Sequence, residues 1–235
     1  MQEYKRYAIY YAPERGAPLG AFGNSWLGID PETGEGLSRP AVAGWSEKQL
    51  IEATSSPSRY GFHGTLKPPF ALNVGYSCGE LDRALKDLSG HLRGIVTGPL
   101  TLRRIGHFLC LCPTGPLDRL NNLSAEIVAG LDQFRAPQSE AQLAKRRARG
   151  LTDRQEKYLQ QYGYPYVMDE FRFHLTLSNS LDGEQLEQLQ ETLEELTAPY
   201  TAEAFQIREL CLFADPGEGE PFKLLKRYPL ADADQ

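Results

Sequence analysis

The chain has 235 residues, of which 41% are hydrophobic and 24% are charged, and its formal net charge is -6. This length and composition are typical of a globular protein with a sizeable core, and they exclude a disordered, collagen-like or coiled-coil chain. The negative charge argues against a protein that coats DNA or RNA, although a local cationic pocket would still bind a small anionic substrate.

The sequence gives no sign of a membrane segment or of a metal-binding cysteine cluster. No stretch approaches the roughly 18 consecutive apolar residues of a membrane span. Residues 1–10 lack the charged, apolar and small-residue order of a signal peptide, so we expect a cytoplasmic protein. The four cysteines have neither CxxC spacing nor nearby histidines, and we interpret them as reduced core residues rather than metal ligands or disulfides.

The first half of the chain is predicted to alternate strands with one helix. Residues 5–11 are rich in aromatic and β-branched types and favour an opening strand. Residues 13–45 contain many glycines and prolines and are predicted to form a long ordered loop. A strand over 60–72 and an amphipathic helix over 78–92 follow. Residues 100–112 are predicted to form one long strand or a hairpin.

The second half repeats this order of elements. Apolar spacing predicts helices over 116–134 and 139–161, a strand over 171–178, an acidic helix over 183–196, and closing strands over 205–213 and 222–228. The order of a histidine-bearing strand, a helix and a strand therefore occurs twice. Apart from the histidine motifs there is no residue-level repeat, so the duplication concerns element order alone.

Two tetrapeptides of the form His-x-Thr-Leu begin at His63 and His174. Both lie in predicted strands, in which successive side chains point to opposite faces. Each strand is thus predicted to have an apolar core face and a polar face. The polar faces carry His63, Thr65 and Lys67 on the first strand, and Arg172, His174 and Thr176 on the second.

These residue types suit the cleavage of a phosphodiester. One group must take a proton from the attacking oxygen and another must give one to the leaving oxygen, and neutral and protonated histidine supply that pair near pH 7. Threonine hydroxyls, with Lys67 and Arg172 as cations, would hold the phosphate oxygens. A single motif would most often be a structural pair of polar residues, but two matched copies favour a site. The residues leave open which histidine is the base.

The two motifs resemble the defining pair of the 2H (two-histidine) phosphoesterase superfamily. The likeness covers nearly the whole chain and is closest to the branch associated with phosphonate degradation. Besides the motifs themselves, it rests on residues 6–11, 26–28, 60–70, 135–137, 146–147, 151–152, 154–155, 163–166 and 171–177. The sequence departs from the pattern at Gln161 and Tyr162, where a tryptophan is expected.

The resemblance implies an α+β fold with two lobes, in which pseudo-twofold antiparallel sheets surround a central cleft and helices lie outside. Residues 1–235 would form a single bilobal domain, with the His63 motif in the first lobe, the His174 motif in the second, and a helical connection over about 116–161. His63 and His174 would face each other from opposite lobes.

The resemblance also implies an activity. It is the hydrolysis of a small cyclic phosphate diester without a metal or other cofactor, and the phosphonate setting points to a phosphoribosyl cyclic phosphate. Two alternatives stay open: a phosphodiesterase acting on 2',3'-cyclic nucleotides or RNA ends, and a binding module that holds a nucleotide or RNA end without turnover.

Three more residues are candidates for substrate binding. Tyr60 and Tyr166 would stack on or hydrogen-bond to a sugar or base, or else would be half-buried anchors beside the histidine strands. Arg146 belongs to a basic run over 145–149 that would bind a second phosphate, or else would be a solvated helix face. The expected partner is a small phosphorylated sugar or nucleotide rather than an extended nucleic acid or a membrane, and the oligomeric state is not readable from the sequence.

Overall fold

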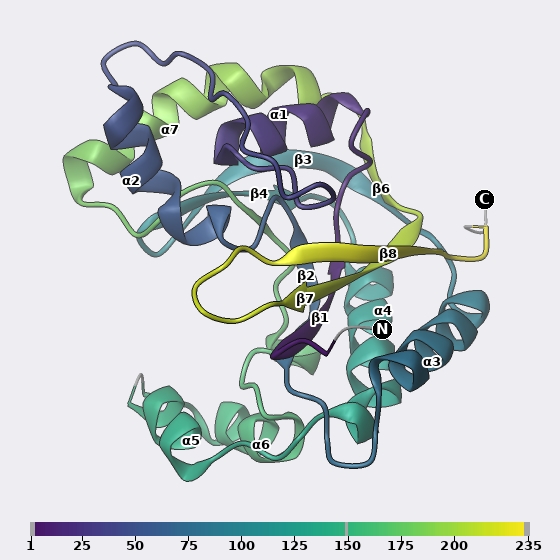
Figure 1. The fold of residues 1–235 in the computed structure, drawn as a ribbon. Helices are drawn as coiled ribbons and strands as arrows, with labels where there is room; N and C mark the ends of the chain where they lie inside the picture. Colours follow the sequence, from purple (N-terminus) through teal and green to yellow (C-terminus); the bar gives the residue numbers. More distant parts are fainter. Residues whose placement is uncertain (1–2, 149, 233–235) are drawn as a thin grey trace.

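The computed structural model of the chain describes residues 3–148 and 150–232, and its centre is one eight-stranded antiparallel sheet (Figure 1). Each pair of neighbouring strands in the sheet is antiparallel. Across the sheet the strands run β6 (Ala204–Ile207), β3 (Ile95–Ile105), β4 (Phe108–Pro113), β5 (Leu175–Thr176), β2 (Gly64–Phe70), β1 (Arg6–Tyr11), β7 (Glu209–Asp215) and β8 (Lys223–Pro229).

The strand order divides the sheet into two halves of four strands each, which meet at the β5–β2 pair. One half contains β2, β1, β7 and β8, and the other contains β5, β4, β3 and β6. In each half the innermost strand begins directly after a motif histidine: β2 after His63 and β5 after His174. The predicted α+β class, with antiparallel sheet halves and helices outside them, is confirmed.

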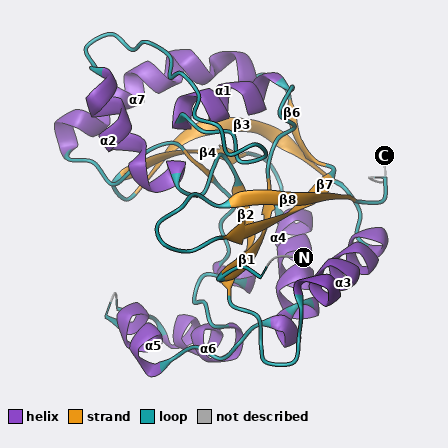
Figure 2. Cartoon of the chain, in the orientation of Figure 1, coloured by secondary structure: helices purple, strands orange, loops and turns teal. Residues whose placement is uncertain are grey.

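Helices cover the two halves separately, as the purple ribbons of Figure 2 show. In the part of the chain that the structure describes, the α-helices are α1 (Pro18–Leu27), α2 (Glu47–Ser58), α3 (Cys78–His91), α4 (Asp118–Gly130), α5 (Glu140–Arg147), α6 (Asp153–Tyr162) and α7 (Gly183–Thr197). Helix α4 packs on β2 and α3 on β8, whereas α7 packs on β3 and β4. None of the described helices has the length and apolar composition that crossing a membrane requires.

Local sequence signals set where these helices begin. Helix α3 starts after Ser77, whose hydroxyl accepts a hydrogen bond from the backbone N–H of Glu80, while the Glu80 carboxylate accepts one from the backbone N–H of Ser77. This reciprocal cap satisfies two backbone donors that the first helical turn leaves unpaired. Leu81 and Leu85 recur at helical spacing and are fully buried, which fastens the helix to the sheet.

Several predicted boundaries were wrong for local reasons. The predicted loop over 13–45 contains α1, which begins at Pro18, a residue suited to the first turn of a helix. The predicted helix over 139–161 is interrupted, because Thr152 caps a new helix, α6. The predicted strand over 205–213 is two strands, with β6 at the edge of one half and β7 inside the other, between β1 and β8. The hairpin alternative for 100–112 is confirmed as β3 and β4.

Candidate active site

The two histidine motifs meet at the seam between the sheet halves. Strands β2 and β5 pair there, with Gly64 and Leu175 as Cα partners. In an antiparallel pair, residues next to these partners on the two strands come opposite each other and point to the same face. Continuing the register therefore places His63 opposite Thr176 and His174 opposite Thr65, with all four on one face.

We call the sheet surface that carries these four residues the histidine face. His63 and His174 are diagonal neighbours on it, and such neighbours are separated by about 7–8 Å. That spacing leaves room for a phosphate group between the two imidazoles. The two rings are close enough for His174 to be among the groups that lower the pKa of His63.

His63 lies immediately before β2 in a packed aromatic environment. Its Nδ1 is 2.8 Å from the carbonyl oxygen of Gly61, and its Nε2 is 3.3 Å from the hydroxyl of Thr65. The ring of Tyr10 stacks on the imidazole with 3.9 Å between the centroids. Burial lowers the pKa of His63 to about 4, against the opposing effect of the Gly61 carbonyl and with a smaller contribution from His174.

His174 repeats one part of this arrangement. Its Nδ1 is 2.7 Å from the carbonyl oxygen of Arg172, again two residues before the histidine. A carbonyl only accepts hydrogen bonds, so Nδ1 carries the hydrogen in both rings and Nε2 is left for the reaction. Burial lowers the pKa of His174 as well. Its aromatic neighbour is Phe108, with 5.7 Å between the ring centroids.

The two threonines continue the histidine face into the neighbouring strands. Thr65 is the Cα partner of Tyr10 on β1, and Thr176 is the Cα partner of Cys110 on β4. Both threonines are partly exposed.

Cys110 and Cys112, which were interpreted as reduced core residues, are free thiols with 3.7 Å between the sulfurs. Cys112 is only partly buried.

The placement of Lys67 on the polar face was wrong. Between Thr65 and Lys67 the pairing of β2 with β1 shifts by one residue, so Lys67 becomes the partner of Ile9. This β-bulge turns Lys67 to the opposite face, where α4 packs. Its ammonium donates to the carbonyl of Val128 at 2.8 Å and the side chain is 2% exposed, so it does not reach a phosphate between the histidines.

Lys67 is instead an internal cation of the core. The ammonium lies 3.6 Å from the carboxylate of Asp132 and 5.3 Å from the ring centre of Phe70. Burial lowers its pKa to about 8, although Asp132 partly opposes the shift. These contacts give Lys67 a structural role between β2 and α4.

Arg172 remains available for an anion on the histidine face. Its side chain is exposed, and within residues 3–148 and 150–232 it forms no hydrogen bond or ion pair through the guanidinium. Its carbonyl orients His174. Arg172 is therefore the cation that the structure brings beside the second motif.

The other predicted binding residues are spread around the site. Tyr60 lies beside His63, with 6.1 Å between the ring centroids. Tyr166 is 38% exposed and packs edge-on against Tyr164, away from direct contact with either imidazole. Arg146 lies over the ring of Tyr164 at 4.8 Å and lines a pocket with Lys67. Within the basic run over 145–149, position 149 is outside the described residues.

Two features of the histidine face were not predicted from the sequence. Tyr10, read only as part of a strand, forms the wall against which His63 stacks. Arg6 and Arg59 approach the buried carboxylate of Asp215 on the same face. Alternation in β1 could have put Arg6 and Tyr10 on one face, but the pairing of β1 with β2 and β7 could not be read from the sequence.

Among the described residues, no group of three or more His, Cys, Asp or Glu side chains is arranged to hold a metal ion. The chemistry available at the seam is that of two imidazoles, two hydroxyls and a guanidinium. It is suited to moving protons around an anionic ester whose oxygens are held by hydrogen bonds.

Fold and site together define an α+β protein with paired His-x-Thr motifs on adjoining strands. The chain belongs to the DUF1045 family, described as a protein of unknown function, whose model matches residues 65–223.

Two curated relatives match nearly the whole chain. The chain is 34% identical over 230 residues to ribose 1,5-bisphosphate phosphokinase PhnN of Janthinobacterium sp. (strain Marseille). This match covers 96% of the chain and 51% of that protein. It is 30% identical over 226 residues to the protein of the same name from Laribacter hongkongensis (strain HLHK9), and this match covers 94% of the chain and 51% of the relative. The chain thus spans about half the length of the curated relatives it matches.

Solved structures similar to the chain include a phosphoesterase, at 15% identity and a TM-score of 0.45, with 97% of this chain and 99% of the other covered. E. coli LigT in complex with 3'-AMP is similar at 17% identity and a TM-score of 0.45, with the same coverage.

Proposed function

We propose that the chain is a metal-independent phosphodiesterase that hydrolyses a small cyclic phosphate diester. The observation that carries the proposal is the pair of imidazoles on the histidine face, each with Nδ1 bound to the carbonyl two residues earlier. Both rings thus offer Nε2 to one phosphate from diagonal positions. Such a pair supplies one proton acceptor and one proton donor to the same ester.

We infer the roles of the two histidines from their surroundings. With a pKa lowered to about 4, His63 is neutral near pH 7 and its Nε2 has a lone pair that can accept a proton, which suits it to act as the base. Among the residues that the structure describes, His174 has one ring neighbour, Phe108, and the exposed Arg172 lies two residues before it. A bound phosphate anion raises the pKa of both histidines, and with His63 as the base we assign the second proton to His174.

In the proposed reaction a water oxygen attacks phosphorus while Nε2 of His63 takes the water proton. The bond from phosphorus to one ring ester oxygen breaks, and Nε2–H of His174 gives its proton to that oxygen. The product is a phosphate monoester with a free hydroxyl. His63 then returns its proton to solvent and His174 regains one, which restores both histidines for the next turnover.

The phosphate oxygens need donors that are aimed before the substrate arrives. Thr65 and Thr176 stand opposite the two histidines across the seam, so their hydroxyls lie on either side of the same space. Arg172 supplies a guanidinium without a competing partner among the described residues. Donors fixed by the sheet stabilise the charge that develops in the transition state without reorganising.

The names of the relatives support a phosphorylated ribose as the substrate. Two of them are named for ribose 1,5-bisphosphate. Opening a 1,2-cyclic phosphate of ribose 5-phosphate at the bond to oxygen 2 yields that compound. We therefore infer that the substrate is ribose 1,2-cyclic phosphate 5-phosphate and that His174 protonates oxygen 2.

We do not extend the phosphokinase activity of the relatives to this chain. The match covers about half of their length. The sequence also has no GxxxxGK[ST] phosphate loop, the motif with which many kinases hold the phosphates of a nucleotide.

A substrate panel tests the proposal. Purified protein is incubated with ribose 1,2-cyclic phosphate 5-phosphate and with 2',3'-cyclic nucleotides, with and without EDTA, and products are followed by phosphorus NMR. We expect cleavage of the ribose compound to a monoester at a rate that EDTA leaves unchanged. Preferred cleavage of the nucleotides would favour the RNA-end alternative, and binding without any product would favour the binding module.

A further inference from the structure

Two arginines share one buried carboxylate on the histidine face. Arg6 donates to Asp215 from Nε at 2.8 Å and from Nη2 at 2.6 Å, and Arg59 lies 3.7 Å from the other carboxylate oxygen. The side chain of Asp215 is fully buried. Burial opposes its ionisation, but the bonds from Arg6 and Gly217 and the charge of Arg59 outweigh it and hold the pKa of Asp215 below its usual range.

An aromatic wall joins this cluster to the candidate active site. Arg6 is Cα partner of Asp215, and two and four residues further along β1 come Ala8 and Tyr10 on the same face. The guanidinium of Arg6 lies 5.4 Å from the ring centre of Phe222. From Phe222 the wall continues to Tyr60 at 4.9 Å and from there to His63 at 6.1 Å.

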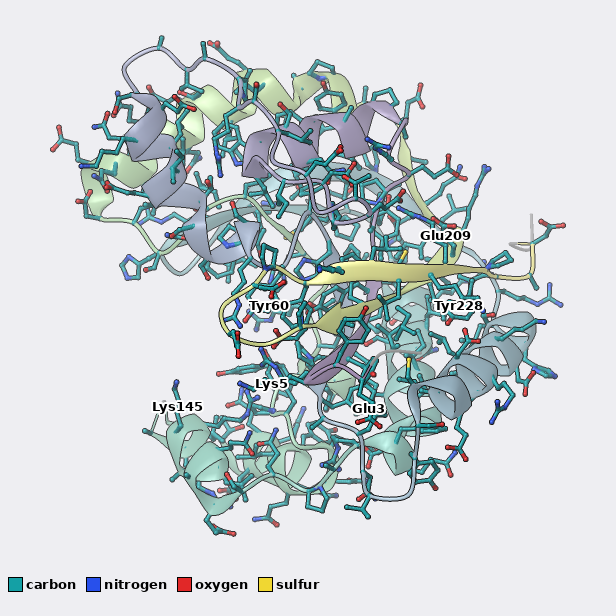
Figure 3. All side chains as sticks on the ribbon, viewed as in Figure 1. Glu3, Lys5, Tyr60, Lys145, Glu209 and Tyr228 are labelled. Atoms are coloured by element: carbon teal, nitrogen blue, oxygen red, sulfur yellow. The ribbon has the colours of Figure 1, made fainter. Side chains whose placement is uncertain are left out.

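Figure 3 shows Tyr60 beside the loop between β7 and β8, the loop that carries Phe222. The backbone supports this contact, because the N–H of Phe222 donates to the carbonyl of Arg59 at 2.7 Å. The arginine cluster, the aromatic wall and His63 are thus linked by direct packing contacts.

The charges at this end of the face do not balance. Two guanidinium groups face a single carboxylate, which leaves one positive charge in excess. Elsewhere on the sheet the opposite holds: Arg227 on β8 is bound by two carboxylates, those of Glu32 and Glu209. An excess cation next to a low-dielectric aromatic wall attracts an anion more strongly than one that is fully paired.

Arg59 also has an unused donor. Its Nε is buried and has no hydrogen-bond partner, although the side chain as a whole is 38% exposed. Arg6 is 33% exposed in spite of its two bonds to Asp215. A buried donor without a partner costs free energy, and such groups call for an additional ligand or solvent contact.

We propose that Arg6 and Arg59 form a subsite for a second phosphate, a monoester carried by the sugar of the cyclic phosphate substrate. The sugar lies along the partly exposed Tyr60, which packs on the buried Phe222, with its cyclic phosphate at the histidines and its monoester at the two arginines. This inference rests on the proposed function and deepens it: the enzyme selects cyclic phosphates that carry a second phosphate group.

The test compares two substrates that differ only in the second phosphate, ribose 1,2-cyclic phosphate with and without the 5-phosphate. The variant is Arg59→Gln, because replacing Arg6 would leave the buried Asp215 without its closest partner. Arg208→Gln is the matched control, since Arg208 is exposed and its guanidinium bonds to Gln206 rather than to a carboxylate. Thermal unfolding of all three proteins checks that they fold.

We expect wild type to prefer the 5-phosphorylated substrate, and Arg59→Gln to lower the ratio of the two kcat/KM values by roughly 10- to 100-fold. The loss should appear mainly in KM, and Arg208→Gln should keep the wild-type ratio. An unchanged ratio in Arg59→Gln, with the fold intact, would overturn the subsite.

A binding experiment separates this subsite from the proposed reaction. Calorimetry measures the binding of ribose 5-phosphate, which has no cyclic phosphate to cleave, to wild type and to Arg59→Gln. Binding that weakens in Arg59→Gln supports the subsite even if neither cyclic phosphate is turned over, in which case only the proposed function fails. Binding that is equal in both proteins, or absent in wild type, counts against the subsite.

Discussion

The two histidines have the same motif and the same carbonyl contact, yet their surroundings differ. His63 is stacked on Tyr10 and flanked by Tyr60 and Phe213, whereas the aromatic neighbour of His174 is Phe108 at 5.7 Å. Their pKa values are both lowered by burial, that of His63 to about 4. Two matching motifs are thus placed in unequal surroundings by the packing of segments far from them in the chain, and burial of an imidazole is the main cause that lowers its pKa.

The largest effect is expected from removing each imidazole in turn. His63→Gln and His174→Gln should each lower kcat on the cyclic phosphate by about 100- to 10,000-fold, the usual worth of a general acid or base. The comparison is sharpened with a nitrophenyl phosphodiester, whose leaving group needs no proton. That substrate should restore turnover in His174→Gln but not in His63→Gln. Equal losses in both variants would show that the assigned roles are wrong.

The cations of the two motifs should behave differently as well. Arg172→Gln should reduce kcat/KM by about 10-fold or more without loss of stability, because the side chain is exposed and its role is to hold phosphate. Lys67→Met should keep most activity but lower the free energy of unfolding by about 1–3 kcal/mol, since the carbonyl of Val128 loses its donor. Kinetics and urea unfolding of both variants check this. The reverse pattern would restore Lys67 to the site.

The second residue of each motif offers a further contrast. Where the second motif has Leu175, the first has Gly64, and a Cβ added there would come 2.2 Å from the ring of Phe173. Gly64→Ala should therefore destabilise the protein by about 1–3 kcal/mol and disturb the β2–β5 seam. Gly183→Ala is the control, because its Cβ would meet no atom within 4 Å. The midpoints of urea unfolding measure both, and equal midpoints would contradict the packing.

The smallest expected effect is in the pH dependence. In the free enzyme, kcat/KM should rise with pH as His63 loses its proton near pH 4, and should fall as His174 loses its proton below pH 6.5.

The stability of the fold should also depend on pH. Because the folded-state pKa of His63 is lowered, the unfolded chain binds more protons than the folded chain between pH 6.5 and about 4, and the free energy of unfolding falls as the pH falls through that range. His63→Gln should weaken this dependence.

Histidine titration by NMR gives the direct measurement. The His63 resonance should titrate at lower pH than that of His174, and both should move to higher pH when a phosphate ester binds between them. A His63 pKa above that of His174 in the free protein would reverse the assignment of base and acid.

Much of this protein was determined by the sequence alone. Apolar periodicity predicted α3, α4 and α7 close to their observed bounds, because an amphipathic stripe is a relation within a few turns of chain. The repeated His-x-Thr form singled out His63 and His174, and alternation put each threonine on the face of its histidine. These are local relations, which residue order fixes.

Other features were decided only by the tertiary structure. A one-residue bulge in β2, set by its pairing with β1, moved Lys67 from the expected face into the core. The contact of Tyr10 with His63 and the sharing of Asp215 by Arg6 and Arg59 depend on which strands lie side by side. Pairing between segments far apart in the chain is set by the whole core, so no local pattern specifies it.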